Sequence, residues 1–405
     1  MQLRALPLLV LAGAFFALPL AAQEPDEPGP YLVGWRDVGF VDQNYGRGAL
    51  VGRVYYPATA AGLDQPADPA HGPYPMVGFM HGSGARPDRY DDIQVHLASW
   101  GFVVPAIDFN GLSMPGIARD ERSILQWTED RSNDPVSWLA GMVRAGDWGA
   151  FGHSMGGGGC PYLLKFEPRV RTLMPMEPYR GVTAGGFANS QAALQAFTGN
   201  LHFVAGSIDL VCNWDTQVLL YSQDALSARR NLFTRIEGAS HFGPSDTPPL
   251  NDPIPGPEQH RMHRRLVGVF FRAEMLGQEN LYGESFGEGA RTEPFEHLVK
   301  SQEPPFWAAR SEVDGSRIAV GLLGNPGDTR AFGWSLAPAS IQTQWGLLGL
   351  DLGQGDGFGY GTGGARGRAL ATLPVRAAWS GRTLYLQGGS VPGGGLTRVI
   401  ALAIP

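Results

Sequence analysis

Six short apolar runs, separated by segments typical of helices, place the strongest limit on how this chain can fold. The runs are rich in β-branched and aromatic residues and are bounded by turn residues, as strands are. Strands that alternate with helices predict a mostly parallel sheet covered by helices on both faces. The nearly continuous apolar character of the runs agrees, because such strands are buried on both sides. The expected strands are residues 76–80, 102–107, 148–152, 172–176, 201–206 and 231–236, and the expected helices are residues 89–100, 134–143, 213–228 and 258–276.

The composition changes after about residue 295. Residues 296–315 combine Pro with charged residues and suggest a linker. Beyond them, short apolar runs alternate with glycine, and nine of the nineteen residues in 346–364 are glycine. Glycine at this density breaks helices and suits turns and bulges. We therefore expect a large α/β domain over residues 30–295 and a small Gly-rich β-domain over residues 316–405.

The first 22 residues have the pattern of a secretory signal peptide. Arg4 supplies positive charge, residues 6–20 form an apolar run, and small residues for cleavage follow. The alternative is a short membrane anchor, but the run is shorter than the ~20 residues that a membrane span needs. The protein is therefore expected to be secreted or periplasmic. The net charge of -7 argues against a nucleic-acid partner, whose binding surface would usually be basic.

The glycine-rich stretch WGAFGHSMGGGGC, Trp148 to Cys160, contains the motif G-x-S-x-G around Ser154. It follows an expected strand and precedes an expected helix that runs to about Phe166, which is the context of a nucleophile elbow. Glycines allow the sharp turn that holds such a serine in strained backbone geometry. The serine then stands at a helix N-terminus, where backbone N–H groups favour a developing negative charge. The alternative is a glycine-rich turn with an incidental serine.

A serine hydroxyl is a weak nucleophile until a base takes its proton. His241 lies just beyond the last expected strand, and Asp209 lies at the carboxyl end of the strand expected at 201–206. The order Ser, Asp, His along the chain is the one expected for an α/β-hydrolase. Asp215 is the second candidate for the acid, although it begins a helix and fits a residue of a first helical turn. Ser154, Asp209 and His241 are thus the expected nucleophile, acid and base.

The other histidines have settings that fit structural roles better. His153 is expected to pack or to brace a loop, because adjacent residues on such a turn diverge. The remaining ones are expected to be surface or capping residues: His71, His96, His202, His260, His263 and His297.

Two backbone donors should hold the oxyanion of the tetrahedral intermediate. One is the N–H of Met155, which follows the nucleophile. The other should come from the loop HGSGAR, residues 81–86, after an earlier strand. Ser83 N–H is the first choice and Gly84 the second, and a plain turn is the alternative for this loop.

Cys160 and Cys212 are the two cysteines of the chain. An exported protein can hold a disulfide, so these residues either form a bridge or remain two small buried thiols. Their separation in space is not fixed by the sequence.

Four segments, GHSMGGGG, LASWGFVVPAID, VAGSIDLV and EGASHFGP, resemble the corresponding segments of cutinase-like polyester hydrolases. These belong with the dienelactone-hydrolase and platelet-activating-factor-acetylhydrolase-like branch of α/β-hydrolases. The resemblance covers roughly residues 31–285 and implies an α/β-hydrolase fold. It gives Ser154, Asp209 and His241 the triad roles and places Ser83 at the second oxyanion donor.

The chain departs from that pattern at two aromatic positions. Ser83 stands where the family usually carries Tyr or Phe, and Tyr179 in MEPYR stands where it tends to carry Trp. Tyr179, Trp214 and Met114 are candidates for the walls of the substrate pocket, and simple packing is the alternative for each. The charged residues Glu177 and Arg180 are expected to pair with each other, and contact with a polar substrate is the alternative.

These observations predict a secreted serine esterase that acts on a small-molecule or polymeric ester through an acyl-enzyme. This chemistry requires no cofactor and no metal. The alternatives within hydrolases are a lipase or phospholipid acyl hydrolase and a peptidase. An acyltransferase and a surface-binding protein with a hydrolase-like body are the alternatives outside them. The partner of the C-terminal β-domain stays open.

Overall fold

A computed structural model of the chain describes residues 24–404 apart from 44–45, 112, 182–187, 247–250, 288–292, 300, 302, 311–315, 325–326, 363–367 and 392–394. The expected signal peptide lies outside the described residues. Among the helices that are described, none is both long enough and apolar enough to span a membrane.

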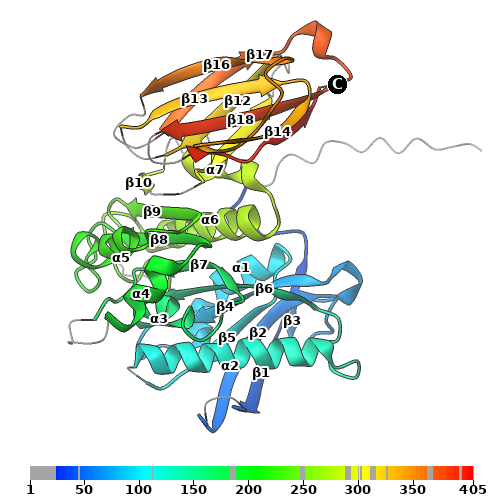
Figure 1. The fold of residues 1–405 in the computed structure, drawn as a ribbon. Helices are drawn as coiled ribbons and strands as arrows, with labels where there is room; N and C mark the ends of the chain where they lie inside the picture. The colour runs from blue at the N-terminus through cyan, green and yellow to red at the C-terminus, as the bar shows by residue number, and fades with distance from the viewer. Residues whose placement is uncertain are drawn as a thin grey trace, which may run out of the picture.

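A ten-stranded sheet forms the centre of the molecule, in the order β10-β9-β8-β7-β6-β4-β5-β2-β1-β3 (Figure 1). Neighbouring strands from β5 to β9 run parallel, and antiparallel pairs join β1 to β2, β2 to β5 and β9 to β10. The α/β-hydrolase fold with a mostly parallel sheet is therefore confirmed, and all six expected strands are present. The bounds are β1 Leu32–Val41, β2 Ala49–Ala58, β3 Gly62–Leu63, β4 Tyr74–Met80, β5 Val104–Asp108, β6 Val143–His153, β7 Val170–Met176, β8 Asn200–Gly206, β9 Arg230–Ile236 and β10 Phe295–Val299.

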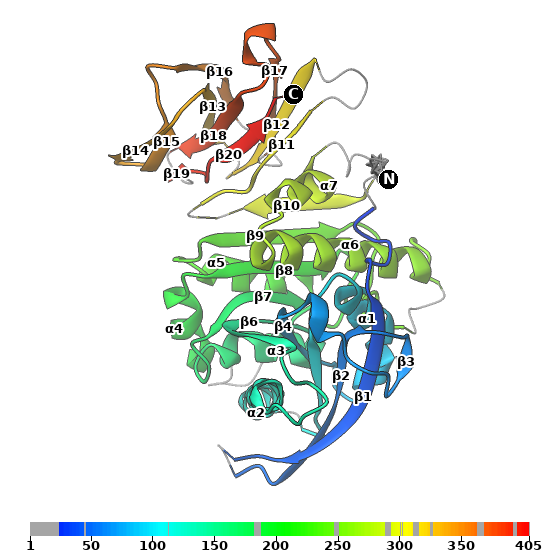
Figure 2. The same ribbon diagram turned by 90° about the vertical axis from the view of Figure 1, so that its right-hand side faces the viewer.

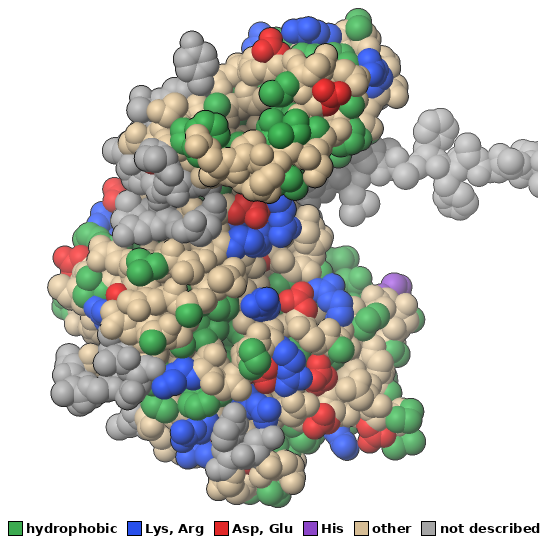
Figure 3. Space-filling view, in the orientation of Figure 1, with side chains coloured by type: hydrophobic (Ala, Val, Ile, Leu, Met, Phe, Trp, Pro, Cys, Tyr) green, Lys and Arg blue, Asp and Glu red, His purple; other side chains and the backbone are tan. Residues whose placement is uncertain are grey.

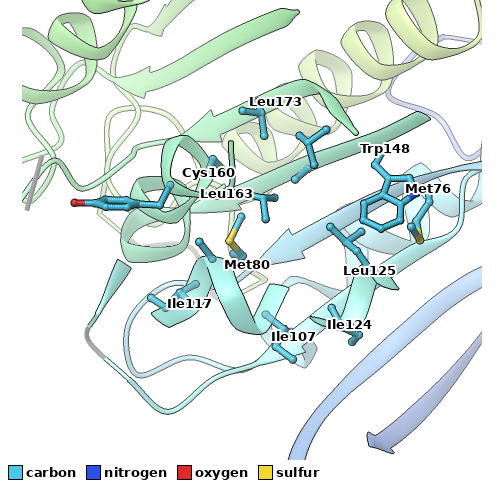
Figure 4. Packing of buried hydrophobic residues seen from close by; sticks show 14 of the residues in the cluster. Met76, Met80, Ile107, Ile117, Ile124, Leu125, Trp148, Cys160, Leu163 and Leu173 are labelled. Atoms are coloured by element: carbon cyan, nitrogen blue, oxygen red, sulfur yellow. The ribbon is translucent and has the colours of Figure 1, made fainter. Parts of the chain in front are cut away.

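Helices cover both faces of this sheet. Helices α2, α3 and α4 contribute to one apolar core, and α1, α6 and α7 contribute to the other. Figure 4 shows the first core, in which Ile117, Ile124 and Leu125 of α2 meet the sheet. Each large apolar side chain buried in this way contributes roughly 1.5–3 kcal/mol. The bounds are α1 Asp91–Ser99, α2 Met114–Asn133, α3 Ser154–Leu163, α4 Ala188–Ala196, α5 Leu219–Asp224, α6 Gly256–Met275 and α7 Tyr282–Phe286, with short turns at Pro69–His71, Pro87–Tyr90, Trp214–Val218 and Glu279–Leu281.

One expected helix was wrong. The helix before β6 is α2, which begins after the N-cap Ser113 and ends at Asn133, whereas residues 134–141 form turns. Asp134 stops the helix because it precedes a proline and because its carboxylate accepts the backbone N–H of Val136 at 3.1 Å. The other expected helices lie at α1, at α6, and at α5 with the π-helical turn Trp214–Val218.

Strands β11 to β20, residues 306–403, form a second unit that we call the C-terminal β module. Its apolar core includes Phe306, Phe332, Trp334 and Trp379. The module lies beyond the β10 edge of the central sheet (Figure 2). The bounds are β11 Phe306–Arg310, β12 Arg317–Leu323, β13 Thr329–Ser335, β14 Pro338–Thr343, β15 Gly346–Leu350, β16 Gly355–Thr362, β17 Arg368–Pro374, β18 Thr383–Val391, β19 Gly395–Leu396 and β20 Ile400–Ala403, with a turn at Ala377–Trp379.

The linker expected at residues 296–315 contains two strands instead. β10 pairs with β9 and so belongs to the central sheet, whereas β11 pairs with β12 in the C-terminal β module. Both segments are short and are separated by prolines, and for this reason the sequence of this stretch resembled a linker.

Arginines and glutamates contact one another where the C-terminal β module adjoins the domain built on the central sheet. Arg230 Nε lies 3.0 Å from Glu274 Oε1, and Arg398 of the module lies 3.2 Å from both Glu279 and Glu303. Figure 3 shows basic and acidic side chains side by side in this zone. We call this set the inter-module charge cluster: Arg229, Arg230, Glu274, Glu279, Glu303 and Arg398.

Candidate active site

Ser154 occupies a strained turn between β6 and α3. Its φ of +54° lies in the left-handed region, which a residue with a side chain rarely adopts. The turn is possible because glycines follow the serine in α3. A Cβ on Gly156 would lie 2.1 Å from Met80 O, and one on Gly158 would lie 2.2 Å from Tyr179 O. The glycines of this stretch therefore let the helix pack closely against its neighbours while the serine points out of the turn.

Three side chains that are distant in the sequence meet at this turn. His241 Nε2 lies 2.9 Å from Ser154 Oγ, and His241 Nδ1 lies 2.8 Å from Asp209 Oδ2. Asp209 follows β8 and His241 follows β9, so parallel strands deliver both to the carboxyl end of the sheet. All three residues are buried to at least nine-tenths. An Nδ1–H that donates to the carboxylate leaves Nε2 free to accept the serine proton.

The carboxylate of Asp209 is fixed by its own loop. Its Oδ1 accepts the backbone N–H groups of Val211 at 2.7 Å and of Cys212 at 2.8 Å. These bonds leave Oδ2 directed at the imidazole. Asp215 has a different environment, because it follows the cap residue Asn213, whose Oδ1 accepts its backbone N–H at 3.1 Å.

A chain of hydrogen bonds joins the loops on the two sides of Ser154. Gly82 N–H donates to Tyr90 Oη at 3.2 Å, Tyr90 Oη lies 2.7 Å from His153 Nδ1, and His153 Nε2 lies 2.7 Å from the carbonyl of His241. One assignment of protons satisfies every link: Tyr90 donates to Nδ1, and the Nε2–H of a neutral His153 donates to the carbonyl. Burial, assisted by the nearby His241, lowers the pKa of His153 well below its usual value, which favours this neutral form.

The expected oxyanion donors come from two segments, the first turn of α3 and the loop after β4. Met155 is in the first turn of α3 and is half-buried, and Ser83 and Gly84 are exposed in the loop after β4. His81 fixes the base of that loop, because its ring stacks on Phe109 with centroids 3.9 Å apart and its Nε2 accepts Phe109 N–H at 3.2 Å.

A cavity of about 340 Å³ opens directly over Ser154. Ser154 and His241 line it together with the loop after β4 and the residues after His241. Its lining is Gly82, Ser83, Gly84, Ala85, Arg86, Arg89, Tyr90, His153, Ser154, His241, Phe242 and Ser245.

Comparison with known proteins places this geometry in a family. The family model described as PET hydrolase-like matches residues 26–249, which is more than half of the chain. The chain belongs to the PET hydrolase-like family. The matched range contains Ser83, Ser154, Asp209 and His241 and ends before β10 and the C-terminal β module.

Curated relatives of this PET hydrolase-like chain are ester hydrolases by name. A bis(hydroxyethyl) terephthalate hydrolase of Streptomyces coelicolor is 30% identical over 32% of this chain and 37% of its own length. A cutinase, est2, of Thermobifida alba is 26% identical over 37% of this chain and 47% of its own length. Lipase 1 of a Moraxella species is 25% identical over 41% of this chain and 48% of its own length. The chain thus spans less than half the length of each of these relatives.

The expected pocket walls of the PET hydrolase-like chain lie outside the cavity lining. Met114 is 7% exposed and lies in the core beside α3. The carbonyl of Tyr179 accepts Tyr221 Oη–H at 3.0 Å, and the Trp214 ring lies 4.1 Å below the guanidinium of Arg235. The lining residues Arg89, Phe242 and Ser245 were not predicted from the sequence, and Arg86 was named there only as the end of the expected oxyanion loop. Their signal was closeness in sequence to the expected oxyanion loop and to His241.

The expected pair of Glu177 and Arg180 was wrong. Glu177 is fully buried with a φ of +40°, and its Oε1 lies 3.1 Å from His263 Nε2. Burial raises the pKa of Glu177, and His263 opposes part of that effect. Arg180 pairs instead with Asp224 at 3.0 Å. The strained backbone at Glu177 turns its side chain inward, which the sequence did not indicate.

The expected surface or capping role was also wrong for most of the other histidines. His96, His202, His260, His263 and His297 are buried, whereas His71 is exposed. His202, for example, bonds Thr234 inside the sheet at 2.8 Å, and burial lowers its pKa to about 3. His263 and His297 also lie in the interior, where His263 Nε2 lies 3.1 Å from Glu177 Oε1 and His297 Nδ1 lies 2.9 Å from Thr234 Oγ1.

Both cysteines are free and buried. Cys212 lies beside Asp209 and His241, and these three residues each offer a ligand atom within 4.8 Å of one another. These three residues could hold a metal ion. Burial raises the pKa of the Cys212 thiol, and Asp209 adds to the effect, so the thiol form is favoured. A bound cation would compete with the Asp209–His241 hydrogen bond for the same side chains.

Proposed function

We propose that this chain hydrolyses carboxylic esters with Ser154 as nucleophile, His241 as general base and Asp209 as the residue that orients the imidazole. The observation that carries the proposal is the pair of hydrogen bonds on the His241 ring, 2.9 Å to Ser154 Oγ and 2.8 Å to Asp209 Oδ2. The relatives named for terephthalate ester, cutin and lipid hydrolysis support the same chemistry.

In the first half of the reaction, Ser154 Oγ attacks the ester carbonyl while His241 Nε2 takes its proton. The backbone N–H groups of Met155 and Ser83 hold the oxyanion of the tetrahedral intermediate. His241 then gives the proton to the leaving alcohol, and the acyl group remains on Ser154. Water repeats the sequence, so that one water is consumed and one acid and one alcohol are released.

We also propose that the protein is exported. Residues 1–22 have the charge, apolar run and small residues of a signal peptide. Expression of the full chain followed by N-terminal sequencing of the exported product tests this, and a product that starts at Met1 would contradict it.

The catalytic proposal is tested with 4-nitrophenyl esters of rising acyl length. We expect Ser154→Ala to lower kcat/KM by about 10⁴-fold or more. The matched control is Ser227→Ala, because Ser227 is exposed in the segment after α5, and it should keep the wild-type rate. Retention of activity by Ser154→Ala would overturn the proposal. A strong preference for long acyl chains would favour a lipase, the activity for which the Moraxella relative is named.

A further inference from the structure

Among the described residues that line the cavity over Ser154 there are two arginines and no carboxylate. Arg86 and Arg89 both lie on the segment between β4 and α1, on the side of the expected oxyanion donor Ser83. The other titratable lining residues are Tyr90, His153 and His241, each already engaged in the hydrogen bonds described above. The charge presented to a molecule in this cavity is therefore positive.

Arg86 stands on the wall between this cavity and a second one of about 400 Å³. Its guanidinium lies 3.4 Å from Asp108 and 3.9 Å from Asp88, and its side chain is 69% exposed. Both carboxylates line the second cavity and not the first. The two carboxylates on the side of the second cavity therefore offset part of the positive charge of Arg86.

Arg89 has surroundings different from those of Arg86. It is exposed, and in the part of the chain that the structure describes no carboxylate lies within ion-pair distance of its guanidinium. Asp246 approaches only through its backbone, whose N–H donates to the Arg89 carbonyl at 2.8 Å, while its carboxylate lies 3.5 Å from His260 Nε2. An unpaired arginine beside a nucleophile can bind an anionic group through charge-assisted hydrogen bonds.

We propose that the site takes esters that carry a second, anionic group, such as a half-ester of a dicarboxylic acid, and that Arg89, assisted by Arg86, binds that group. This inference rests on the proposed function and narrows its substrate class. The anion can belong to the acid part or to the alcohol part of the ester, because both parts are attached to the carbonyl group that Ser154 attacks. Because Arg89 is exposed, salt should screen the attraction.

The test compares an anionic ester with a neutral ester of similar size, and the ratio for each variant is divided by the wild-type ratio so that differences in leaving group and intrinsic reactivity cancel. For the acid part, mono-4-nitrophenyl adipate is compared with 4-nitrophenyl hexanoate. For the alcohol part, 4-acetoxybenzoate is compared with its methyl ester. The measured quantity is the ratio of kcat/KM for the anionic ester to kcat/KM for the neutral one. The proteins are the wild type, Arg89→Gln, and Arg86→Gln with Arg89→Gln, all as the full chain.

We expect Arg89→Gln to lower this ratio by about threefold to tenfold in at least one pair of esters. The double variant should lower it further, and 0.5 M NaCl should lower it in the wild type. Arg317→Gln removes the same charge from an exposed position in the C-terminal β module and should leave the ratio unchanged. The pair of esters that responds identifies which part of the substrate carries the anion.

An unchanged ratio in Arg89→Gln for both pairs overturns this inference and leaves the proposed function intact, provided that neutral esters are hydrolysed. The proposed function itself fails in a different way, if the wild type hydrolyses none of the four esters or if Ser154→Ala hydrolyses them equally well.

Discussion

The core beneath α2 and the boundary with the C-terminal β module each bury a glutamate, but in opposite surroundings. Glu121 on α2 is fully buried, and within the described residues neither of its carboxyl oxygens has a hydrogen-bond partner. The Glu274 side chain is equally buried, yet it contacts Arg229, Arg230 and the hydroxyl of Tyr282.

The two pKa values move in opposite directions as a result. Burial raises the pKa of Glu121 well above its usual value, and the adjacent Asp120 adds to the rise. Burial also works against the ionised form of Glu274, but Arg230 and Arg229 outweigh it and lower the pKa. Burial alone therefore does not decide the charge of a side chain, because the partners decide it. The neutral form of Glu121 is therefore favoured in the core, whereas the ionised form of Glu274 is favoured where it contacts the two arginines.

The largest expected loss of stability follows from substitution of Glu274, the buried glutamate that has arginine partners. Glu274→Gln leaves the buried guanidinium of Arg230 without its principal counter-charge, so we expect a loss of about 3–5 kcal/mol in the free energy of unfolding. Urea unfolding at pH 7, followed by tryptophan fluorescence, measures it. Glu258→Gln is the control, because Glu258 pairs with Arg261 on a surface where its side chain is 45% exposed. If Glu274→Gln and Glu258→Gln were equally stable, a buried ion pair would contribute no more to the stability of this protein than an exposed one.

The contribution of Glu121, the buried glutamate without a hydrogen-bond partner among the described residues, to the free energy of unfolding should depend on pH. The pKa of Glu121 is raised on folding, so its contribution is complete below the unfolded-state value near 4.5 and is lost as the pH rises toward the folded-state pKa. Glu121→Gln removes this titration. Its free energy of unfolding relative to the wild type should therefore rise steadily as the pH is increased from 4 to 9, because the wild type loses stability over that range and the variant does not.

Thermal unfolding of both proteins across that range gives the difference. Glu258→Gln again serves as the control, with the opposite sign: an Arg261 partner lowers the pKa of Glu258, so any effect of this variant appears as the pH falls through the acid range. A difference between Glu121→Gln and the wild type that does not change with pH would mean that Glu121 is ionised in the folded protein.

The smallest expected effect is at the edge of the inter-module charge cluster. Arg398 contacts Glu279 and Glu303, but its side chain is 57% exposed and its charge is screened by water. Arg398→Gln should therefore lower the free energy of unfolding by only about 0.5 kcal/mol at low salt, and by less in 0.5 M NaCl. Urea unfolding at the two salt concentrations checks this. A loss as large as that of Glu274→Gln would show that exposure is a poor guide within this cluster.

Much of the fold and of the candidate site was predictable because the relevant signals are local. Each buried strand is a continuous apolar run, and the turn at Ser154 needs its glycines in adjacent positions. Asp209 and His241 were identified because each follows a strand of a parallel sheet, and the structure brings them to Ser154. The helix α2 was missed because its polar residues are numerous and its end depends on one Asp–Pro step.

The pocket walls could not be derived in the same way. Tyr179, Trp214 and Met114 were chosen for their chemistry, and all three pack against other parts of the protein. Arg86 and Arg89 became visible only when the loop after β4 was set over Ser154. A side chain of this kind can face a cavity, a neighbour or water, and only the surrounding elements select among these.

By itself, the sequence determined the parallel sheet, the strained turn at Ser154 and the order of the three residues that converge on it, because these depend on local backbone chemistry and on strand direction. Only the tertiary structure decided which carboxylates keep their charge, which arginines lack a partner and which residues line the cavity. The reason is that burial and electrostatic partnership are properties of groups that are distant in the chain and adjacent in space.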